Sequence, residues 1–149
     1  MDRLEKPISN LVELIETPLK EGKEAGLVIR GNSMWPLLHD GVDKIFLKRV
    51  DFYRNYDIIL YRRNSGNYVL HRIIGKKNGA YILAGDGEFE KEYPIYPNQI
   101  LAKATRGIRK GKPFSCDSIR YKIYSFIWSK SLYFRPIIVK LAVWVRRAV

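Results

Sequence analysis

A serine, a histidine and an aspartate lie at three separate points of the chain where together they could form a nucleophilic site. The serine is Ser33, within the segment Gly31-Asn32-Ser33-Met34-Trp35-Pro36. Gly31 allows the backbone to turn sharply and Pro36 stiffens the exit, so the hydroxyl of Ser33 should be held exposed. The same residue types are typical of ordinary surface turns. The segment alone therefore leaves both interpretations open.

A serine hydroxyl is a weak nucleophile until a base accepts its proton, so the site needs a base. The chain has two histidines. His71 alternates with Val69 and Ile73 on one face of a predicted strand, whereas His39 falls in a turn where we expect it to be solvated. His71 is therefore the candidate base. Asp86 follows a short apolar run, and its carboxylate could orient the imidazole.

These ordered segments resemble the superfamily of bacterial signal peptidase I, the endoplasmic-reticulum-type signal peptidases and the LexA-like self-cleaving repressors. The resemblance covers residues 25 to 112, and several blocks in order are more specific than any one of them. It implies a serine endopeptidase with Ser33 as nucleophile, His71 as general base and Asp86 as the orienting acid. The matching blocks are Gly31–Pro36, Asp57–Tyr61, His71–Ile73, Gly85–Asp86 and Ile100–Ala104.

The base block is closest to the endoplasmic-reticulum-type branch, which has histidine where the other two branches have lysine. The pKa of a histidine starts near 6.5, so this base needs no desolvation to become neutral at physiological pH. If Asp86 stabilises the imidazolium, the pKa of His71 should lie at about 6 to 7.5.

The chain also departs from the family pattern at two places. Family members often carry a hydroxyl two residues before the nucleophile, where this chain has Gly31. The backbone N–H of Ser33 and the Asn32 side chain would then have to stabilise the oxyanion. The family's second aspartate is missing, and three glutamates remain candidates for its place: Glu88, Glu90 and Glu92.

The 149 residues suggest one domain with three parts, and its charge lies mainly at the C-terminus. Of the net charge of +12, residues 106–149 carry +10, from eleven basic residues and one acid. We expect an N-terminal helix in residues 1–24, ended or kinked by Pro18, a peptidase β domain in 25–112, and basic amphipathic helices in 113–149. Acids interrupt every apolar run in residues 1–23, so we expect no export signal or membrane anchor there.

The central part reads as short strands separated by turn residues. The fold class that this predicts is mainly β, a coiled antiparallel sheet like that of the LexA and signal-peptidase families. The loops 64–67 and 77–79 should join neighbouring strands as hairpins. The predicted strands are 27–30, 44–50, 58–62, 68–74, 80–83 and 100–108.

The C-terminal part changes to helical periodicity, and Pro136 should separate two helices. Residues 137–145 are strongly apolar but too few for the roughly 20 that span a bilayer. Tryptophans flanked by basic residues suit an anionic membrane surface. We therefore expect peripheral or monotopic membrane association on the cytoplasmic side; the alternative is that these helices only cover the β domain. The expected membrane-contacting residues are Trp128, Arg135, Lys140, Trp144, Arg146 and Arg147.

Other function classes find less support in the sequence. Two histidines and the single Cys116 lack the spacing of a metal site, and no phosphate loop or dinucleotide fingerprint is present, so we expect no metal and no cofactor. Nucleic acid is a weaker candidate partner, although basic and aromatic residues alternate in the tail. The main alternative to a peptidase that cleaves a leader or signal-like peptide is a non-catalytic basic binding protein on the same fold, recognising a membrane surface or nucleic acid.

Overall fold

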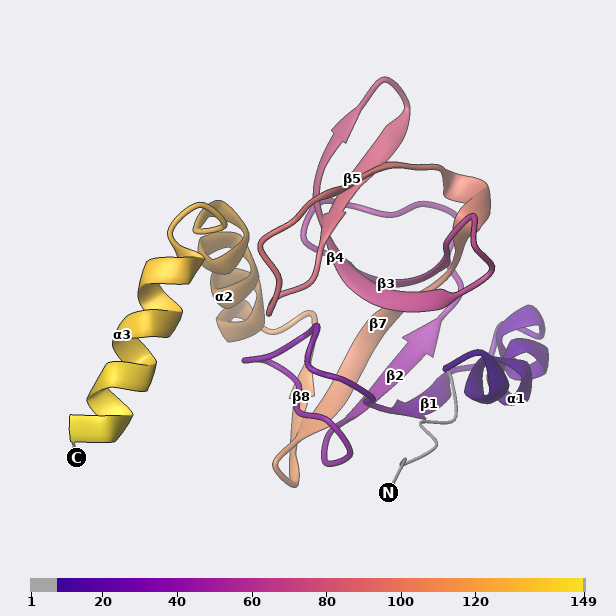
Figure 1. The fold of residues 1–149 in the computed structure, drawn as a ribbon. Coiled ribbons are helices and arrows are strands. Elements are labelled where there is room, and N and C mark those ends of the chain that lie inside the picture. Colours follow the sequence, from indigo (N-terminus) through magenta and orange to yellow (C-terminus); the bar gives the residue numbers. More distant parts are fainter. Residues whose placement is uncertain (1–7, 149) are drawn as a thin grey trace.

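The computed structural model describes residues 8–148 and confirms the mainly β fold (Figure 1). Eight antiparallel strands form one sheet in the order β1-β2-β7-β3-β4-β5-β6, and β8 pairs with β7 beside this path. The register shifts between β2 and β7, between β3 and β7 and between β4 and β5. Such bulges increase the local twist, which explains how one sheet coils around its own core.

Six of the eight strands were predicted from the sequence, and their bounds agree within a few residues. Both predicted hairpins are confirmed, since residues 64–67 join β3 to β4 and residues 77–79 join β4 to β5. The strands are β1 (Ala25–Val28), β2 (Lys44–Lys48), β3 (Ile58–Arg62), β4 (Tyr68–Lys77), β5 (Ala80–Ala84), β6 (Glu92–Ile95), β7 (Ile100–Arg109) and β8 (Lys112–Ser115).

The two strands that the sequence did not predict, β6 and β8, each contain a proline. Pro94 lies in β6 and Pro113 in β8. A proline cannot donate to a strand ladder, so it argues against a strand except at a sheet edge. Both strands lie at such edges. Because β8 ends at Ser115, the sheet continues past residue 112, where the β domain was expected to end.

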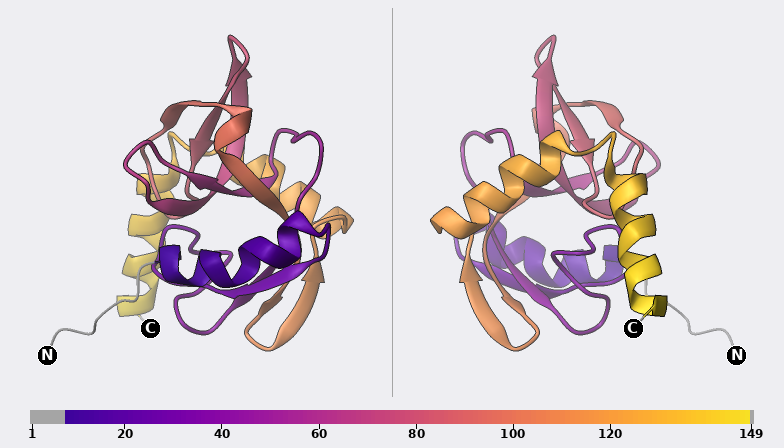
Figure 2. Two further views of the ribbon diagram at one scale, coloured as in Figure 1. Left: turned by 90° about the vertical axis from the view of Figure 1, so that its right-hand side faces the viewer. Right: turned by 90° about the vertical axis from the view of Figure 1, so that its left-hand side faces the viewer.

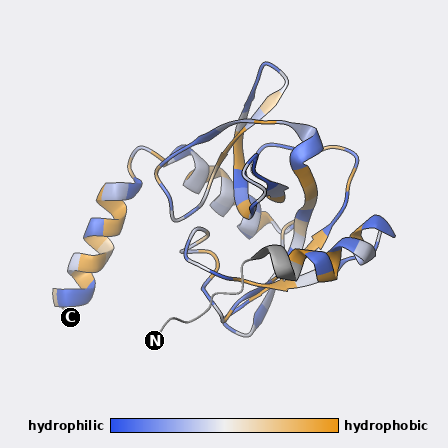
Figure 3. Ribbon diagram, turned by 45° about the vertical axis from the view of Figure 1, so that its right-hand side comes forward, coloured by the Kyte–Doolittle hydropathy of each residue, from blue (hydrophilic) through white to orange (hydrophobic). Residues whose placement is uncertain are grey.

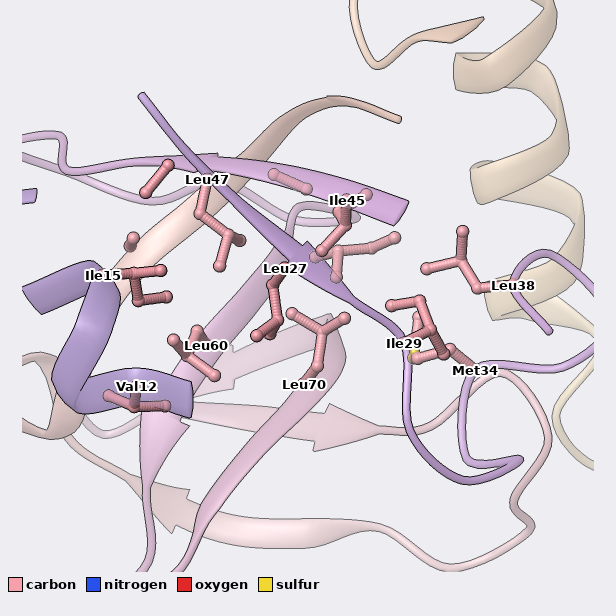
Figure 4. Packing of buried hydrophobic residues seen from close by; sticks show 14 of the residues in the cluster. Val12, Ile15, Leu27, Ile29, Met34, Leu38, Ile45, Leu47, Leu60 and Leu70 are labelled. Carbon is pink, nitrogen blue, oxygen red and sulfur yellow. The ribbon is translucent and has the colours of Figure 1, made fainter. Parts of the chain in front are cut away.

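The larger core lies between helix α1 (Ile8–Lys20) and one face of the sheet (Figure 4). Helical spacing places Val12, Ile15 and Leu19 on the buried side of α1. The first seven residues of the expected N-terminal helical part lie outside the described residues. Pro18 does not end the helix, which continues to Lys20; the proline removes only the one helical hydrogen bond that its own N–H would have made.

The smaller core lies on the opposite face of the sheet, where β3, β4 and β5 meet. Tyr61 and Ile59 of β3 and Ile73 of β4 are fully buried there. The register pairs Ile59 with His71 and Tyr61 with Val69, so Tyr61 and His71 are diagonal neighbours on this face. The apolar face predicted for β4 is therefore confirmed, and His71 lies on that face beside the smaller core.

Two helices follow the sheet, and they relate to it differently (Figures 1 and 2). Helix α2 (Ile119–Lys130) is capped by Ser118, whose Oγ accepts a hydrogen bond from the Tyr121 N–H at 3.3 Å, and it packs against the β domain. The predicted second helix exists as α3 (Arg135–Ala148), but residues 131–134 separate it from α2, and Pro136 lies in its first turn rather than between the helices. Helix α3 extends from the end of α2, on the same side of the sheet as that helix (Figures 1 and 2). Within residues 8–148 no helix combines the length and apolarity needed to cross a bilayer.

Candidate active site

Ser33 lies in a tight turn that follows β1, as the sequence predicted. Gly31 has φ of +80°, which glycine adopts without strain, and its N–H donates to Asp40 Oδ1 at 2.9 Å. Met34, the residue after the serine, is buried in the larger core and anchors the turn to it (Figure 4). Ser33 itself is half-buried. The turn thus presents the serine at the surface of a packed core.

The loop Gly85-Asp86-Gly87 packs directly against this turn, backbone on backbone. The Gly87 N–H donates to the Ser33 carbonyl oxygen at 2.9 Å. A Cβ atom on Gly85 would lie 2.4 Å from that same oxygen and 3.1 Å from Nε2 of His71. The Ser33 carbonyl oxygen and His71 Nε2 therefore lie within 5.5 Å of each other, the sum of the two distances. Glycine is required at position 85 because any side chain would separate the serine turn from the histidine.

His71 is buried, and its two ring nitrogens have different surroundings. Nδ1 lies 3.2 Å from the Tyr61 hydroxyl, which in turn donates its only proton to Glu92 Oε2 at 2.6 Å. The Tyr61 oxygen must therefore accept from His71, which places the imidazole proton on Nδ1. Nε2 then carries the lone pair and makes no hydrogen bond within residues 8–148. The geometry thus leaves a basic nitrogen facing the serine turn.

The pKa of His71 is lower than the sequence suggested. Burial lowers it to about 4; the charge of Glu92 raises it against this effect, and the charge of Arg63 lowers it further. Glu92 also pairs with Arg63. The expected value of about 6 to 7.5 was wrong because it neglected the desolvation of the ring. At neutral pH the imidazole is neutral and able to accept a proton.

Two of the three candidate glutamates lie near His71. Glu92 is held at 4.0 Å from Nδ1 by its bonds to Tyr61 and Arg63. Glu88 Oε2 lies 3.4 Å from Nε2 without forming a hydrogen bond, and burial raises the pKa of Glu88. Of the three, Glu92 is therefore the carboxylate placed to act on the imidazole through a fixed contact.

Asp86 does not orient His71, which corrects the role expected from the sequence. Its carboxylate forms a doubly hydrogen-bonded ion pair with Arg72, with Oδ1 and Oδ2 each 2.8 Å from a guanidinium nitrogen. The Tyr124 hydroxyl donates to Oδ2 at 3.0 Å. Both charged groups are fully buried. Arg72 is adjacent to His71 on β4 and points to the opposite face of the strand, so an acid bound to Arg72 is directed away from the imidazole.

Helix α2 is held to this ion pair by a set of polar contacts. Arg72 also donates to Ser125 Oγ at 2.7 Å and to the Tyr121 hydroxyl at 3.2 Å. The Trp128 Nε1–H donates to the Asp86 carbonyl at 2.8 Å. Because each buried charge has several partners, the contact between α2 and the Gly85 loop is specific as well as tight.

Two residues expected at a membrane therefore act inside the fold instead. Trp128 is bound to the Asp86 carbonyl, and Arg135 is fully buried and donates to the carbonyls of Gly85 and Glu88 at 2.9 and 3.1 Å. Basic and aromatic residue types alone could not distinguish a charge that faces lipid from one that caps carbonyl groups. The other four expected contacts, Lys140, Trp144, Arg146 and Arg147, are exposed on α3.

A small cavity of about 200 Å³ joins the candidate residues. Ser33, His71 and Glu88 line it, together with residues 27–30, which end and follow β1, and the first residues of β4. His39 does not line it; contrary to the sequence expectation of a solvated side chain, its Nδ1 lies 2.6 Å from the buried Asp43. The cavity thus brings Ser33 and His71 together.

Tyr61 is the site residue that sequence reasoning missed. In the sequence it is only the last residue of the block Asp57–Tyr61, and a tyrosine in a strand is most often a core residue. The available signal was the alternation of Tyr61 with Ile59, which places its hydroxyl on the same face as His71.

The contacts of Tyr61 and Glu92 predict how acid should affect activity. A neutral imidazole accepts a proton and an imidazolium does not, so kcat/KM should rise with pH through an inflection near 4. Glu92→Gln removes the charge that raises the pKa of His71 and should move the inflection to lower pH. Tyr61→Phe removes the acceptor for Nδ1–H and should lower kcat on the order of 10-fold.

These effects can be measured as pH–rate profiles from about pH 3.5 to 7, within the range where circular dichroism shows the fold intact. Tyr81→Phe is the matched control, because Tyr81 belongs to the same core but bonds only to the Tyr53 carbonyl. A wild-type inflection between about 6 and 7.5 would show that the base is not the buried, Tyr61-bound imidazole.

Comparison of the chain with models of known protein families finds no match, and comparison with curated proteins finds none either.

Proposed function

We propose that this protein is a serine endopeptidase of the signal-peptidase type, which cleaves a leader or signal-like peptide. The observation that supports it most is the state of His71. Its Nδ1–H is tied to Tyr61, and its Nε2 is neutral, unpaired within residues 8–148 and in one cavity with Ser33. A core histidine with no chemical task would normally have both nitrogens satisfied or exposed to water.

In the proposed reaction Ser33 Oγ attacks the scissile carbonyl carbon while His71 Nε2 accepts the hydroxyl proton. The imidazolium keeps its bond to Tyr61, and the Glu92 carboxylate at 4.0 Å stabilises its charge. It then gives the proton to the leaving amine, and water hydrolyses the acyl-enzyme by the same exchange. The Ser33 N–H, which makes no hydrogen bond within residues 8–148, and the exposed Asn32 side chain are the oxyanion donors in this scheme.

The cavity lies between two strands with unpaired edges, which suits an extended peptide. Among residues 8–148, β1 pairs only with β2, and residues 68–71 of β4 pair only with β3, because β5 joins β4 from Arg72 onward. A peptide could add to either edge through main-chain hydrogen bonds. A volume of about 200 Å³ favours a small side chain beside the scissile bond.

Ser33→Ala separates a peptidase from a non-catalytic binding protein. Peptides cleaved by the full-length protein, identified by mass spectrometry after digestion of a proteome-derived peptide library, should remain uncut by this variant. A binding protein would cut none of them in either form and would retain its bound partner after the substitution.

Membrane association is proposed as well, because α2 and α3 expose a large apolar surface. At about 100° per residue, five apolar side chains of α3 fall within an arc of about 120°. Lys140, Arg146 and Arg147 fall outside this arc. Figure 3 shows the mixture of hydrophobic and hydrophilic residues along α3. Apolar side chains beside excess positive charge suit an anionic bilayer surface. The apolar residues within this arc of α3 are Ile137, Ile138, Leu141, Trp144 and Val145, while the exposed Val143 falls outside it; the exposed apolar residues of α2 are Ile119, Ile123, Phe126 and Ile127.

The double variant Leu141→Glu/Trp144→Glu tests this surface without disturbing the core, since both side chains are more than half exposed. It should reduce the partitioning of the full-length protein into anionic vesicles on the order of 100-fold, because two apolar side chains no longer enter the bilayer boundary. Flotation measures this, with Val42→Glu/Phe52→Glu as the control for exposed apolar residues elsewhere. Equal flotation of all three proteins, or a wild type that self-associates instead of floating, would contradict the proposal.

A further inference from the structure

A second and larger cavity adjoins the candidate active site. It has a volume of about 600 Å³ and lies between the end of α1, the β3–β4 hairpin and the start of β7. Arg63 and Tyr68 line both this cavity and the one that holds Ser33 and His71. A peptide that leaves the active site along β4 toward its start therefore enters the larger cavity.

The walls of this cavity are basic. Its charged lining residues are Lys20, Arg49, Arg62, Arg63 and a single acid, Glu16. Glu16 pairs with Lys20 at 3.3 Å. The cavity therefore carries more positive than negative charge even before the pairing of its arginines is considered.

Two of the arginines keep their charge available. Arg63 is paired with Glu92, but Arg49 and Arg62 have no acidic partner within residues 8–148. The Arg62 guanidinium lies over the Tyr68 ring, 5.8 Å from its centroid, which restricts where its N–H groups point. Arg62 and Arg49 are thus the two guanidinium groups that an anionic side chain entering the cavity would meet.

This charge is local and does not follow from the basic tail. Residues 106–149 carry +10 of the net +12, so residues 1–105, which build the whole cavity, are close to neutral at +2. A cavity with two unpaired arginines on a nearly neutral body is a specific electrostatic feature.

We propose that this basic cavity is a substrate subsite that selects peptides with acidic residues on one flank of the cleavage site; this rests on the peptidase function proposed above. Tyr68 lies three residues from His71 on β4, a distance of about 10 Å along an extended strand. The selected Asp or Glu side chains therefore lie about three to five positions from the scissile bond. Carboxylates suit this site because guanidinium groups bind them in a fixed two-pronged geometry.

The test uses a proteome-derived peptide library digested by four full-length proteins: the wild type, Ser33→Ala, Arg49→Gln/Arg62→Gln and the control Lys122→Gln. Both arginines have exposed side chains, so their replacement should leave the fold intact. Lys122 is exposed on α2 and lines neither cavity. Mass spectrometry of the products gives the frequency of Asp and Glu at each position around the Ser33-dependent cuts.

We expect Asp and Glu to be enriched three to five positions from the cut on one side, in the wild type and in Lys122→Gln alike. The arginine double variant should lose this enrichment, and kcat/KM for a peptide with two such acids should fall roughly 2- to 30-fold. Ser33-dependent cleavage without acidic enrichment, or with enrichment that survives the double variant, overturns the inference alone. Absence of any Ser33-dependent cleavage overturns the proposed peptidase function and this inference with it.

Discussion

Ser33→Ala and His71→Ala should each lower kcat on the order of 10⁴-fold or more, and the double variant should be little worse than either one. The hydroxyl is a useful nucleophile only while Nε2 can accept its proton, so the loss of one partner already removes the contribution of the other. Cleavage rates for one peptide from the library digestion, measured for the wild type, the two single variants and the double variant, test this directly.

Two controls keep this result specific. Ser65→Ala changes an exposed serine of the β3–β4 loop and should leave kcat unchanged. His39→Ala removes a histidine that bonds to Asp43 and does not line the cavity, so it should affect stability more than kcat. Losses at Ser33 and His71 that multiply in the double variant would show that the two residues do not act as a unit.

Asp86→Ala should lower the free energy of unfolding by about 3 to 5 kcal/mol, because it leaves the charge of Arg72 buried without its partner. Burial by itself would lower the pKa of Arg72, but Asp86 holds it above its ordinary value. Removing Asp86 lowers that pKa, but the guanidinium stays charged at neutral pH because arginine is so strong a base. Against a typical total stability of about 5 to 15 kcal/mol, this is a large fraction.

Urea denaturation of the variant measures this loss, and Asp51→Asn, an exposed aspartate, should change stability by less than about 0.5 kcal/mol. The pH–rate profile provides a second measurement on the folded fraction. Its inflection should move to lower pH by less than for Glu92→Gln, because the charge of Asp86 raises the pKa of His71 less than that of Glu92 does. An unchanged stability together with a loss of kcat as large as that of His71→Ala would return Asp86 to the role of orienting His71.

The parts of the fold that the sequence predicted are those where local pattern and burial agree. β3 was predicted with its observed bounds because four of its five residues are buried, so the strand appears in the sequence as a short continuous apolar run. Ser33 and His71 were found because a glycine turn and an alternating strand leave local traces. β6 and β8 were missed because proline argues against a strand, and only the position at a sheet edge removes that objection.

The partners of the site residues could not be predicted, because they depend on contacts between distant parts of the chain. Asp86 and Glu92 are both acids after β5, and nothing local shows that one bonds to Arg72 and the other to Tyr61. In the same way, Arg135 and Arg147 look alike in the sequence. One is fully buried against the Gly85 loop and the other is exposed at the end of α3.

The contact between α2 and the Gly85 loop also matters for the order in which the chain is synthesised. Ser33, His71 and Asp86 leave the ribosome well before Tyr121, Ser125 and Arg135, the groups that complete the hydrogen bonds of Arg72 and of the Gly85 carbonyl. Until those later residues emerge, the Arg72–Asp86 pair lacks the hydrogen bonds and the cover that α2 provides, and the Gly85 loop lacks its contact with Arg135. We therefore expect the nascent chain to acquire an ordered serine turn only after Arg135 has emerged, so the proposed peptidase activity should begin no earlier than that.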